Sequence, residues 1–171
     1  MKRISTLIVA VTLTSLSMLH PLHAATPSNP YGTSVIDPAG PNESILKISK
    51  KGKSVEFTLK KLKAMKSSEI SIYEPFVKKR QKFTVIPLSA LFKKVGISGK
   101  DLVETIALND YIYSSTASKF VAANAYLAIA REGKDIPYSE GGPVRLVFAD
   151  SSRWASNLDA WNWSLAKIVV K

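Results

Sequence analysis

The stretch Gly141-Gly142-Pro143-Val144-Arg145-Leu146-Val147-Phe148-Ala149 places two glycines and a proline directly before an apolar run that contains one arginine. A turn followed by Leu146, Val147 and Phe148 predicts a strand buried on both faces, because branched and aromatic side chains favour such positions. Arg145 has two interpretations. Its head lies in water at the end of the strand, as is usual for arginine, or it is buried and its guanidinium requires an anion or several carbonyl acceptors.

The first 24 residues have the pattern of a secretory signal peptide. Met1-Lys2-Arg3 is positively charged, residues 4–19 are apolar apart from Ser and Thr, and Leu22-His23-Ala24 ends in the small residue that signal peptidase requires. The apolar run is only marginally long enough to remain as a membrane anchor, and a polar, proline-containing segment follows it. We therefore expect cleavage after Ala24, a periplasmic location and no transmembrane segment in the mature chain.

Two side chains on which much enzyme chemistry depends are absent from the expected mature chain. His20 and His23 lie in the predicted signal peptide, and the sequence contains no cysteine. This excludes Ser-His-Asp and Cys-His mechanisms, a disulfide scaffold, and zinc sites with ligands other than carboxylates. The remaining length predicts one domain that is held together by its core alone.

Turn-forming residues and apolar runs divide the rest of the chain. Residues 25–44 are rich in Pro, Gly, Ser and Asn and predict a flexible leader, so that the domain spans residues 45–171. Apolar runs predict strands at 45–49, 54–57, 70–72, 83–86, 103–108, 111–114, 126–130 and 146–148, and a final alternating strand that runs from Trp161 to Val170. Short helices are predicted after Thr58 as N-cap, over 88–95 between Pro87 and Gly96, and as one turn over 118–122. Residues 78–82 predict an exposed basic loop.

These elements predict an α+β fold, with mixed β-sheets and short helices on their outside. Positive charge is concentrated in its first half, because residues 47–100 contain fifteen basic and three acidic side chains. Such a face either attracts anionic ligands and partners or only keeps the protein in solution. No nucleic-acid-binding motif accompanies the charge, so we expect no nucleic-acid partner.

The order of several motifs is similar to that of a known family. These are Phe57-Thr58-Leu59-Lys60-Lys61-Leu62 after a strand, the segment from Phe83 to Ile97, Asn109-Asp110-Tyr111, Gly142-Pro143-Val144-Arg145 and a closing tryptophan segment. In this order they resemble the oxidoreductase molybdopterin-binding domain of sulfite oxidases, and most closely its small exported stand-alone versions, over about residues 45–171. The resemblance implies a sulfite-oxidase-like fold with a pterin-phosphate pocket at one end of the sheets.

The sequence departs from that family at the metal. The resemblance implies that catalytic members bind molybdenum through a cysteine thiolate, in a loop that falls near Tyr73-Glu74-Pro75-Phe76 in this chain. No cysteine stands there or elsewhere, and the histidine and several arginines that hold the pterin phosphate have no evident counterpart. We therefore expect no cofactor. The alternative is molybdopterin held by Arg145, Arg153 and backbone amides beside an atypical metal site.

Three functions compete. The first is a non-catalytic periplasmic module that binds a small anion or a partner protein in a signalling or redox system. The second is a molybdopterin-dependent oxidoreductase, or its subunit, and the third is a structural or adhesion protein whose basic face rests on anionic surfaces. The missing thiolate favours the first.

The candidate ligand-binding residues lie at strand ends and in turns, and no catalytic residue or metal ligand is predicted. Arg145 and Arg153 form the best candidate anion site. Glu74 and Asp110 suit acid–base chemistry, or else Asp110 only caps a turn. The tryptophans are candidates for stacking on a flat ligand. The full set is Tyr73, Glu74, Asn109, Asp110, Tyr111, Arg145, Arg153 and Trp154.

Overall fold

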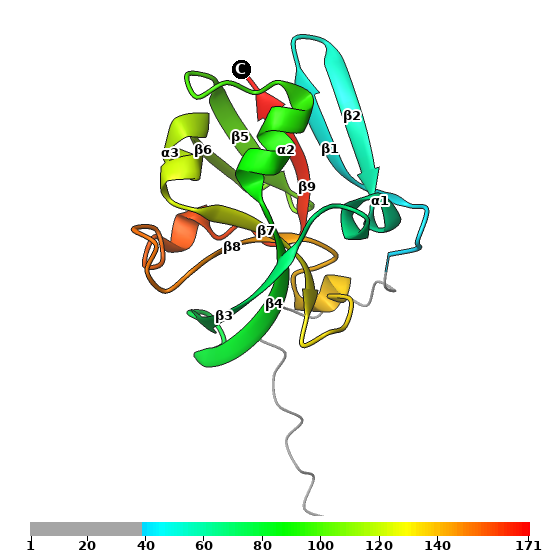
Figure 1. Ribbon diagram of the computed structural model, residues 1–171. Coiled ribbons are helices and arrows are strands. Elements are labelled where there is room, and N and C mark those ends of the chain that lie inside the picture. The colour runs from blue at the N-terminus through cyan, green and yellow to red at the C-terminus, as the bar shows by residue number, and fades with distance from the viewer. Residues whose placement is uncertain (1–38) are drawn as a thin grey trace, which may run out of the picture.

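Two β-sheets organise residues 39–171, the part of the chain that the computed structural model describes. The predicted signal peptide and residues 25–38 of the predicted leader lie outside these residues. Figure 1 shows the sheets with the three α-helices around them. Among residues 39–171, no helix has the length and apolar character needed to cross a membrane.

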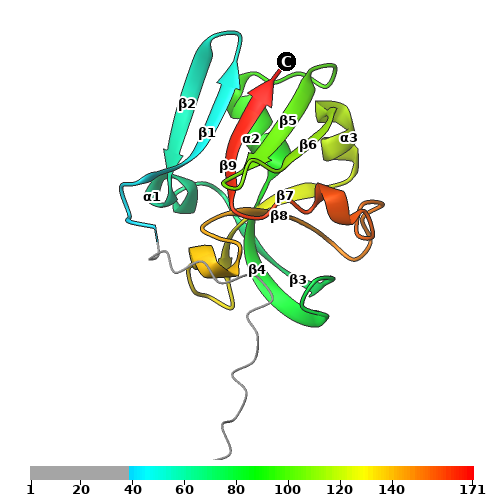
Figure 2. The same cartoon turned by 180° about the vertical axis from the view of Figure 1, so that it is seen from behind.

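The five-stranded sheet is mixed and has the order β2-β1-β9-β5-β6. Its strands are β1 (Ser44–Lys50), β2 (Lys53–Thr58), β5 (Leu102–Ala107), β6 (Ile112–Thr116) and β9 (Leu165–Val170). β9 pairs in parallel with β1 and antiparallel with β5, so the strand latest in sequence occupies the middle of the sheet (Figure 2).

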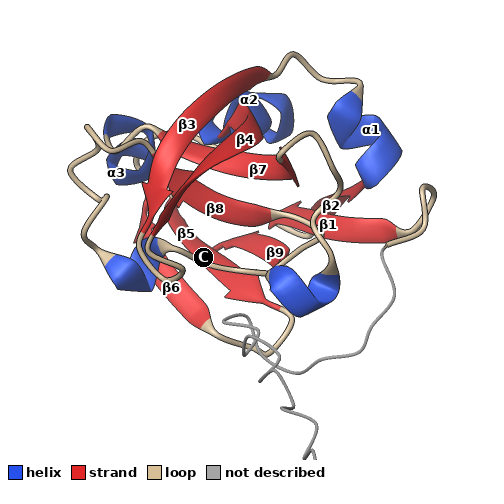
Figure 3. Cartoon of the chain, turned by 90° about the horizontal axis from the view of Figure 1, so that it is seen from below, coloured by secondary structure: helices blue, strands red, loops and turns tan. Residues whose placement is uncertain are grey.

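The four-stranded sheet is antiparallel and has the order β3-β4-β7-β8. Its strands are β3 (Ser68–Glu74), β4 (Lys79–Pro87), β7 (Ala125–Arg131) and β8 (Arg145–Phe148). Buried residues of both sheets belong to one hydrophobic cluster, and Figure 3 shows β8 next to the strands of the other sheet. All four residues of β8 are buried, as the apolar run predicts.

The helices are short and follow single strands, as expected for an α+β fold with peripheral helices. They are α1 (Leu59–Lys63), α2 (Leu88–Val95) and α3 (Ala117–Ala122). Thr58 caps α1 by accepting a hydrogen bond from the backbone N–H of Lys61. Pro87 precedes α2, and Gly96 ends it in the left-handed conformation with φ 74°. Two 3₁₀ turns, η1 (Tyr138–Glu140) and η2 (Leu158–Ala160), complete the helices and strands of the described residues.

Two local predictions are wrong. Residues 79–82 are not a loop but the first part of β4, paired with β3 from Glu74↔Lys79 onward. This end of the hairpin projects from the rest of the fold (Figure 1), so basic side chains remain in water on a strand. Trp161 and Trp163 are not in a strand, since β9 begins at Leu165. Their segment instead bonds to the glycine turn, where the Ser164 N–H donates to the Gly141 carbonyl.

One charged contact joins the end of β1 to the segment after α2. The Lys50 ammonium donates to Asp101 Oδ2 at 2.6 Å, and both side chains are about four-fifths buried, with 19% and 20% exposed. The hydrogen bond from Lys50, followed by that from the backbone N–H of Ser98, lowers the pKa of the Asp101 carboxyl below 3.8. The folded state therefore stabilises the ionised form of the Asp101 carboxyl more than the unfolded state does.

Asp101→Asn is expected to lower the melting temperature at pH 7, because it removes this contact. A lowered folded-state pKa adds stability that is complete above pH 3.8 and is lost as pH falls through the folded-state pKa. The difference in melting temperature between parent and variant should thus narrow below pH 3.8. Thermal denaturation at pH 7 and at about pH 3 measures it, and equal melting temperatures at pH 7 would contradict the assignment. Asp110→Asn, an exposed turn substitution, serves as the charge control.

Candidate functional site

The turn at Gly141 and Gly142 brings the main chain close to two neighbours. Gly141 has φ 81°, and a Cβ there would lie 3.3 Å from atoms of the Trp163 side chain. A Cβ on Gly142 would lie 1.9 Å from the carbonyl oxygen of Ile136, which no real side chain permits. Glycine is therefore required at Gly142, and the left-handed Gly141 lets the Trp163 side chain pack directly on the turn.

Arg145, which follows this turn, is fully buried and is paired inside the protein. Its Nη2 donates to Glu74 Oε1 at 3.0 Å, and both side chains have 0% exposure. The guanidinium carbon also lies 4.4 Å from the centroid of the Trp163 ring, within the range of cation–π attraction. The interpretation with the Arg145 head in water is wrong. Glu74, at the end of β3, supplies the anion that burial requires.

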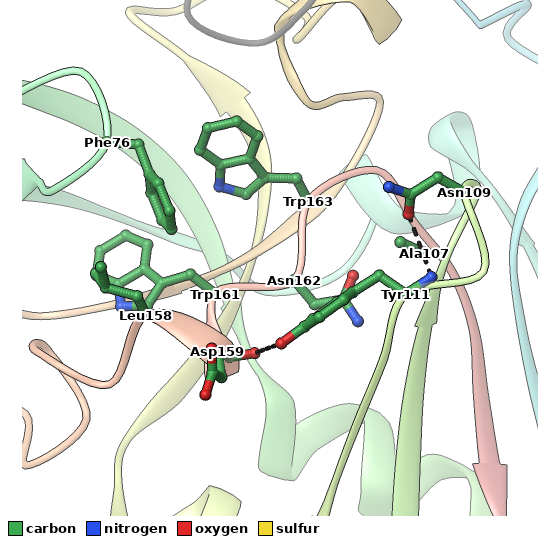
Figure 4. A pocket seen from close by; sticks show the side chains of 9 residues that line it. All are labelled: Phe76, Ala107, Asn109, Tyr111, Leu158, Asp159, Trp161, Asn162 and Trp163. Carbon is green, nitrogen blue, oxygen red and sulfur yellow. Dashed lines mark hydrogen bonds between the residues drawn. The ribbon is translucent and has the colours of Figure 1, made fainter.

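A cleft of about 290 Å³ opens beside Trp163. Figure 4 shows its side chains arranged around a shared space. They come from the β3–β4 turn, the β5–β6 turn, η2 and the segment before β9. The lining residues are Phe76, Ala107, Asn109, Tyr111, Leu158, Asp159, Trp161, Asn162 and Trp163.

Four of the nine lining residues are aromatic. Phe76 meets Trp163 edge to face, with ring centroids 4.6 Å apart and planes at 72°, and it meets Trp161 at 6.4 Å. Trp161 is buried with 4% exposure, whereas Phe76 is 37% exposed. The cleft therefore has a fixed tryptophan base and a phenylalanine at its edge.

Tyr111 forms the opposite side of the cleft. Its hydroxyl donates to the backbone carbonyl of Asp159 at 3.0 Å, and its N–H donates to Asn109 Oδ1. Burial, followed by the negative charge of Asp159, raises the pKa of the Tyr111 hydroxyl. The phenol is thus held protonated and bridges the β5–β6 turn to η2 (Figure 4).

Asn162 is a polar residue in the base of the cleft. It has 0% exposure, and its Nδ2 donates to the Thr105 carbonyl at 2.9 Å. Within residues 39–171 its Oδ1 has no hydrogen-bond partner. An amide oxygen carries partial negative charge, and leaving it buried without a donor is costly.

Of the predicted site residues, Asn109 and Tyr111 line the cleft. Glu74 and Arg145 form the buried pair beneath Trp163 and have no exposed surface. Asp110 is exposed in the β5–β6 turn, with φ 61°. Glu74 is therefore sealed in the interior while Asp110 faces solvent, and the structure does not present them together as an acid–base couple.

The other predicted residues lie apart from the cleft lining. Tyr73 is 51% exposed, and its N–H donates to Asp150 Oδ1. Arg153 is exposed, whereas Arg145 is buried, so the expected pair of arginines is not presented on one surface. Trp154 is partly buried, and its ring packs edge to face on Phe148.

Seven lining residues were not in the predicted set of binding residues, although the tryptophans were candidates for stacking on a flat ligand: Phe76, Ala107, Leu158, Asp159, Trp161, Asn162 and Trp163. The Trp161-Asn162-Trp163 triplet carries a usable signal, because a buried amide between two tryptophans suits a ligand site better than a strand core. Leu158 and Asp159 give no such signal, since their position depends on the η2 turn.

The comparison with protein families gives one match. Residues 74–157 match the family described as oxidoreductase molybdopterin binding domain. No curated protein matches the chain.

Proposed function

Residues 74–157 are an oxidoreductase molybdopterin binding domain, and on this premise we propose that the protein is an exported, non-catalytic member of the family that binds a ligand in the aromatic cleft. The family binds molybdopterin, and the matched segment begins at Glu74. The proposal depends on the chemistry of Glu74 and its neighbours, where the resemblance places the metal-binding loop.

The residues present do not fit a molybdenum cofactor of the expected kind. The chain contains no cysteine to supply a thiolate, and a carboxylate or phenolate would make a different, harder site. Within residues 39–171, no three His, Cys, Asp or Glu side chains cluster as metal ligands. The cleft lining contains Asp159 but neither lysine nor arginine, which leaves a phosphate without a charged partner there.

The buried pair of Glu74 and Arg145 is the observation that carries the proposal. The resemblance places the metal-binding loop near Tyr73–Phe76, and there the chain has Glu74, with 0% exposure, bonded to Arg145 at 3.0 Å. Because Arg145 has 0% exposure, an anion could reach its guanidinium only by entering the interior beside this carboxylate. We therefore assign the ligand to the neighbouring cleft. The buried pair of Glu74 and Arg145 supports the cleft wall, because Arg145 packs against Trp163.

Protein purified from its own periplasm is expected to contain no stoichiometric molybdenum and no pterin. Elemental analysis and pterin fluorescence after acid oxidation measure both. A molybdenum enzyme isolated from the same cells is the control for cofactor supply. Stoichiometric molybdenum in the purified protein would contradict the proposal and favour the alternative of an oxidoreductase with an atypical metal site.

Export rests on the Met1–Ala24 pattern, and the intact mass of the same preparation tests cleavage after Ala24. A periplasmic or membrane partner protein in a signalling or redox system is the second candidate for what the domain binds. The concentration of fifteen basic residues between 47 and 100 favours it.

A further inference from the structure

Within residues 39–171 of this protein, whose net charge is +11, two acidic side chains at or next to the aromatic cleft form no ion pair. Residues 39–171 contain twelve acidic side chains. Eight form ion pairs, and Glu43 and Glu132 accept hydrogen bonds. The remaining two are Asp110 and Asp159, whose carboxylates do neither within the described residues.

One of these acids lines the cleft, and the other is next to it in sequence. Asp159 lines the cleft, and Asp110 directly precedes Tyr111, which lines it too. No lysine or arginine is among the lining residues. Among the described residues, the cleft lining therefore carries one carboxylate that forms no ion pair, that of Asp159, and no positive charge, although basic residues outnumber acidic ones in the chain by 24 to 13.

The walls add to this negative potential. The faces of aromatic rings carry partial negative charge and attract cations within about 6 Å of the ring centroid. The cleft presents the rings of Phe76, Tyr111, Trp161 and Trp163. The protein itself uses this attraction, because the Arg145 guanidinium carbon lies 4.4 Å from the Trp163 centroid.

The size and chemistry of the lining restrict the cation. A volume of about 290 Å³ is at the lower end for small-molecule sites. Hard metal ions require several oxygen ligands, and no cluster of three acidic or imidazole ligands exists among residues 39–171. Rings instead suit a cation that carries apolar groups.

We propose that the cleft binds a small organic cation, an ammonium ion with alkyl substituents, with the charge against the rings of Phe76 and Tyr111 and towards Asp159. This inference rests on the proposed function for the location of the ligand site, and it adds the chemical class of the ligand. The sequence predicted an anionic ligand at Arg145, whereas this inference assigns a cationic ligand to the cleft.

Choline and its neutral carbon isostere, 3,3-dimethylbutan-1-ol, form the matched pair of probes. They differ in charge but hardly in shape. Binding to the mature protein is measured by isothermal titration calorimetry and by tryptophan fluorescence, to which Trp161 and Trp163 contribute together with Trp154. Choline is expected to bind at least about tenfold more tightly than the isostere, because only the cation gains from the rings and from Asp159.

Variants locate the site. Phe76→Leu keeps an apolar side chain but removes the ring, and is expected to weaken choline binding by about two- to fivefold. Asp159→Asn is expected to weaken it by about threefold, and less at high salt because the carboxylate is exposed. Glu56→Gln removes an equal charge from β2, where Glu56 pairs with Lys47, and should leave binding unchanged.

Equal binding of choline and its isostere would overturn the proposal. So would absence of choline binding to folded protein, or an equal effect of Glu56→Gln and Asp159→Asn. None of these results bears on the molybdenum content. The ligand class is therefore tested by titration, and the non-catalytic function by metal analysis.

Discussion

Glu74→Gln is expected to destabilise the fold by about 3–5 kcal/mol, because it leaves the charge of Arg145 buried without its anion. Both side chains have 0% exposure, and Glu74 Oε2 also accepts the backbone N–H of Val77 in the β3–β4 turn. Urea denaturation followed by far-ultraviolet circular dichroism measures the loss. Glu69→Gln is the matched control, since Glu69 lies on the same strand, and its ion pair with Lys82, at 3.7 Å, is more than half exposed. That control should cost less than about 1 kcal/mol.

A double variant separates the effect of the buried charge on stability from the effect of side-chain packing. Replacing both partners with apolar residues, as in Glu74→Leu with Arg145→Met, removes the desolvation cost together with the attraction and should recover much of the lost stability. A loss of stability in Glu74→Gln no greater than in Glu69→Gln would show that the pair is not what holds β3 to β8.

Gly142→Ala is expected to destabilise the protein by about 3 kcal/mol or more, as overpacking against a fixed backbone does. The added Cβ would lie 1.9 Å from the Ile136 oxygen and 2.5 Å from the Ile136 carbonyl carbon. Both are backbone atoms, so neither can rotate away. Because the Trp163 side chain packs on the adjacent Gly141, tryptophan fluorescence should report a displaced cleft wall together with the lower melting temperature.

Gly99→Ala is the matched control for Gly142→Ala. A Cβ on Gly99 would meet the Ser118 Cβ at 3.5 Å, an ordinary van der Waals contact, and this glycine does not have a positive φ. Its melting temperature should stay close to that of the parent. If Gly142→Ala also melts like the parent, the turn moves freely and does not position Trp163.

Much of the fold could be predicted because local signals and tertiary packing agree. Thr58, Pro87 and Gly96 mark the helix ends as their backbone preferences require. The apolar run after the glycine turn forms the fully buried β8. The family match over residues 74–157 is consistent with the motif order between β3 and η2.

The site was harder to predict, because it depends on which distant residues become neighbours. Arg145 required an anion, but nothing local identified Glu74, which is 71 positions away. Asp159 lies in no recognisable sequence motif. Its place in the cleft follows only from its contact with Tyr111, whose hydroxyl donates to the Asp159 carbonyl. Residues 79–82 have the composition of a loop, but pairing with β3 makes them a strand.

The position of β9 determines when the domain can be completed. Residues 165–170 are synthesised after the eight other strands, but they lie between β1 and β5. Until they have left the ribosome, the two hairpins that they join remain separate, and their pairing spans more than a hundred residues of chain. Long-range pairing of this kind forms slowly. The five-stranded sheet therefore cannot be completed before β9 has been synthesised, a delay that suits secretion of the proposed precursor.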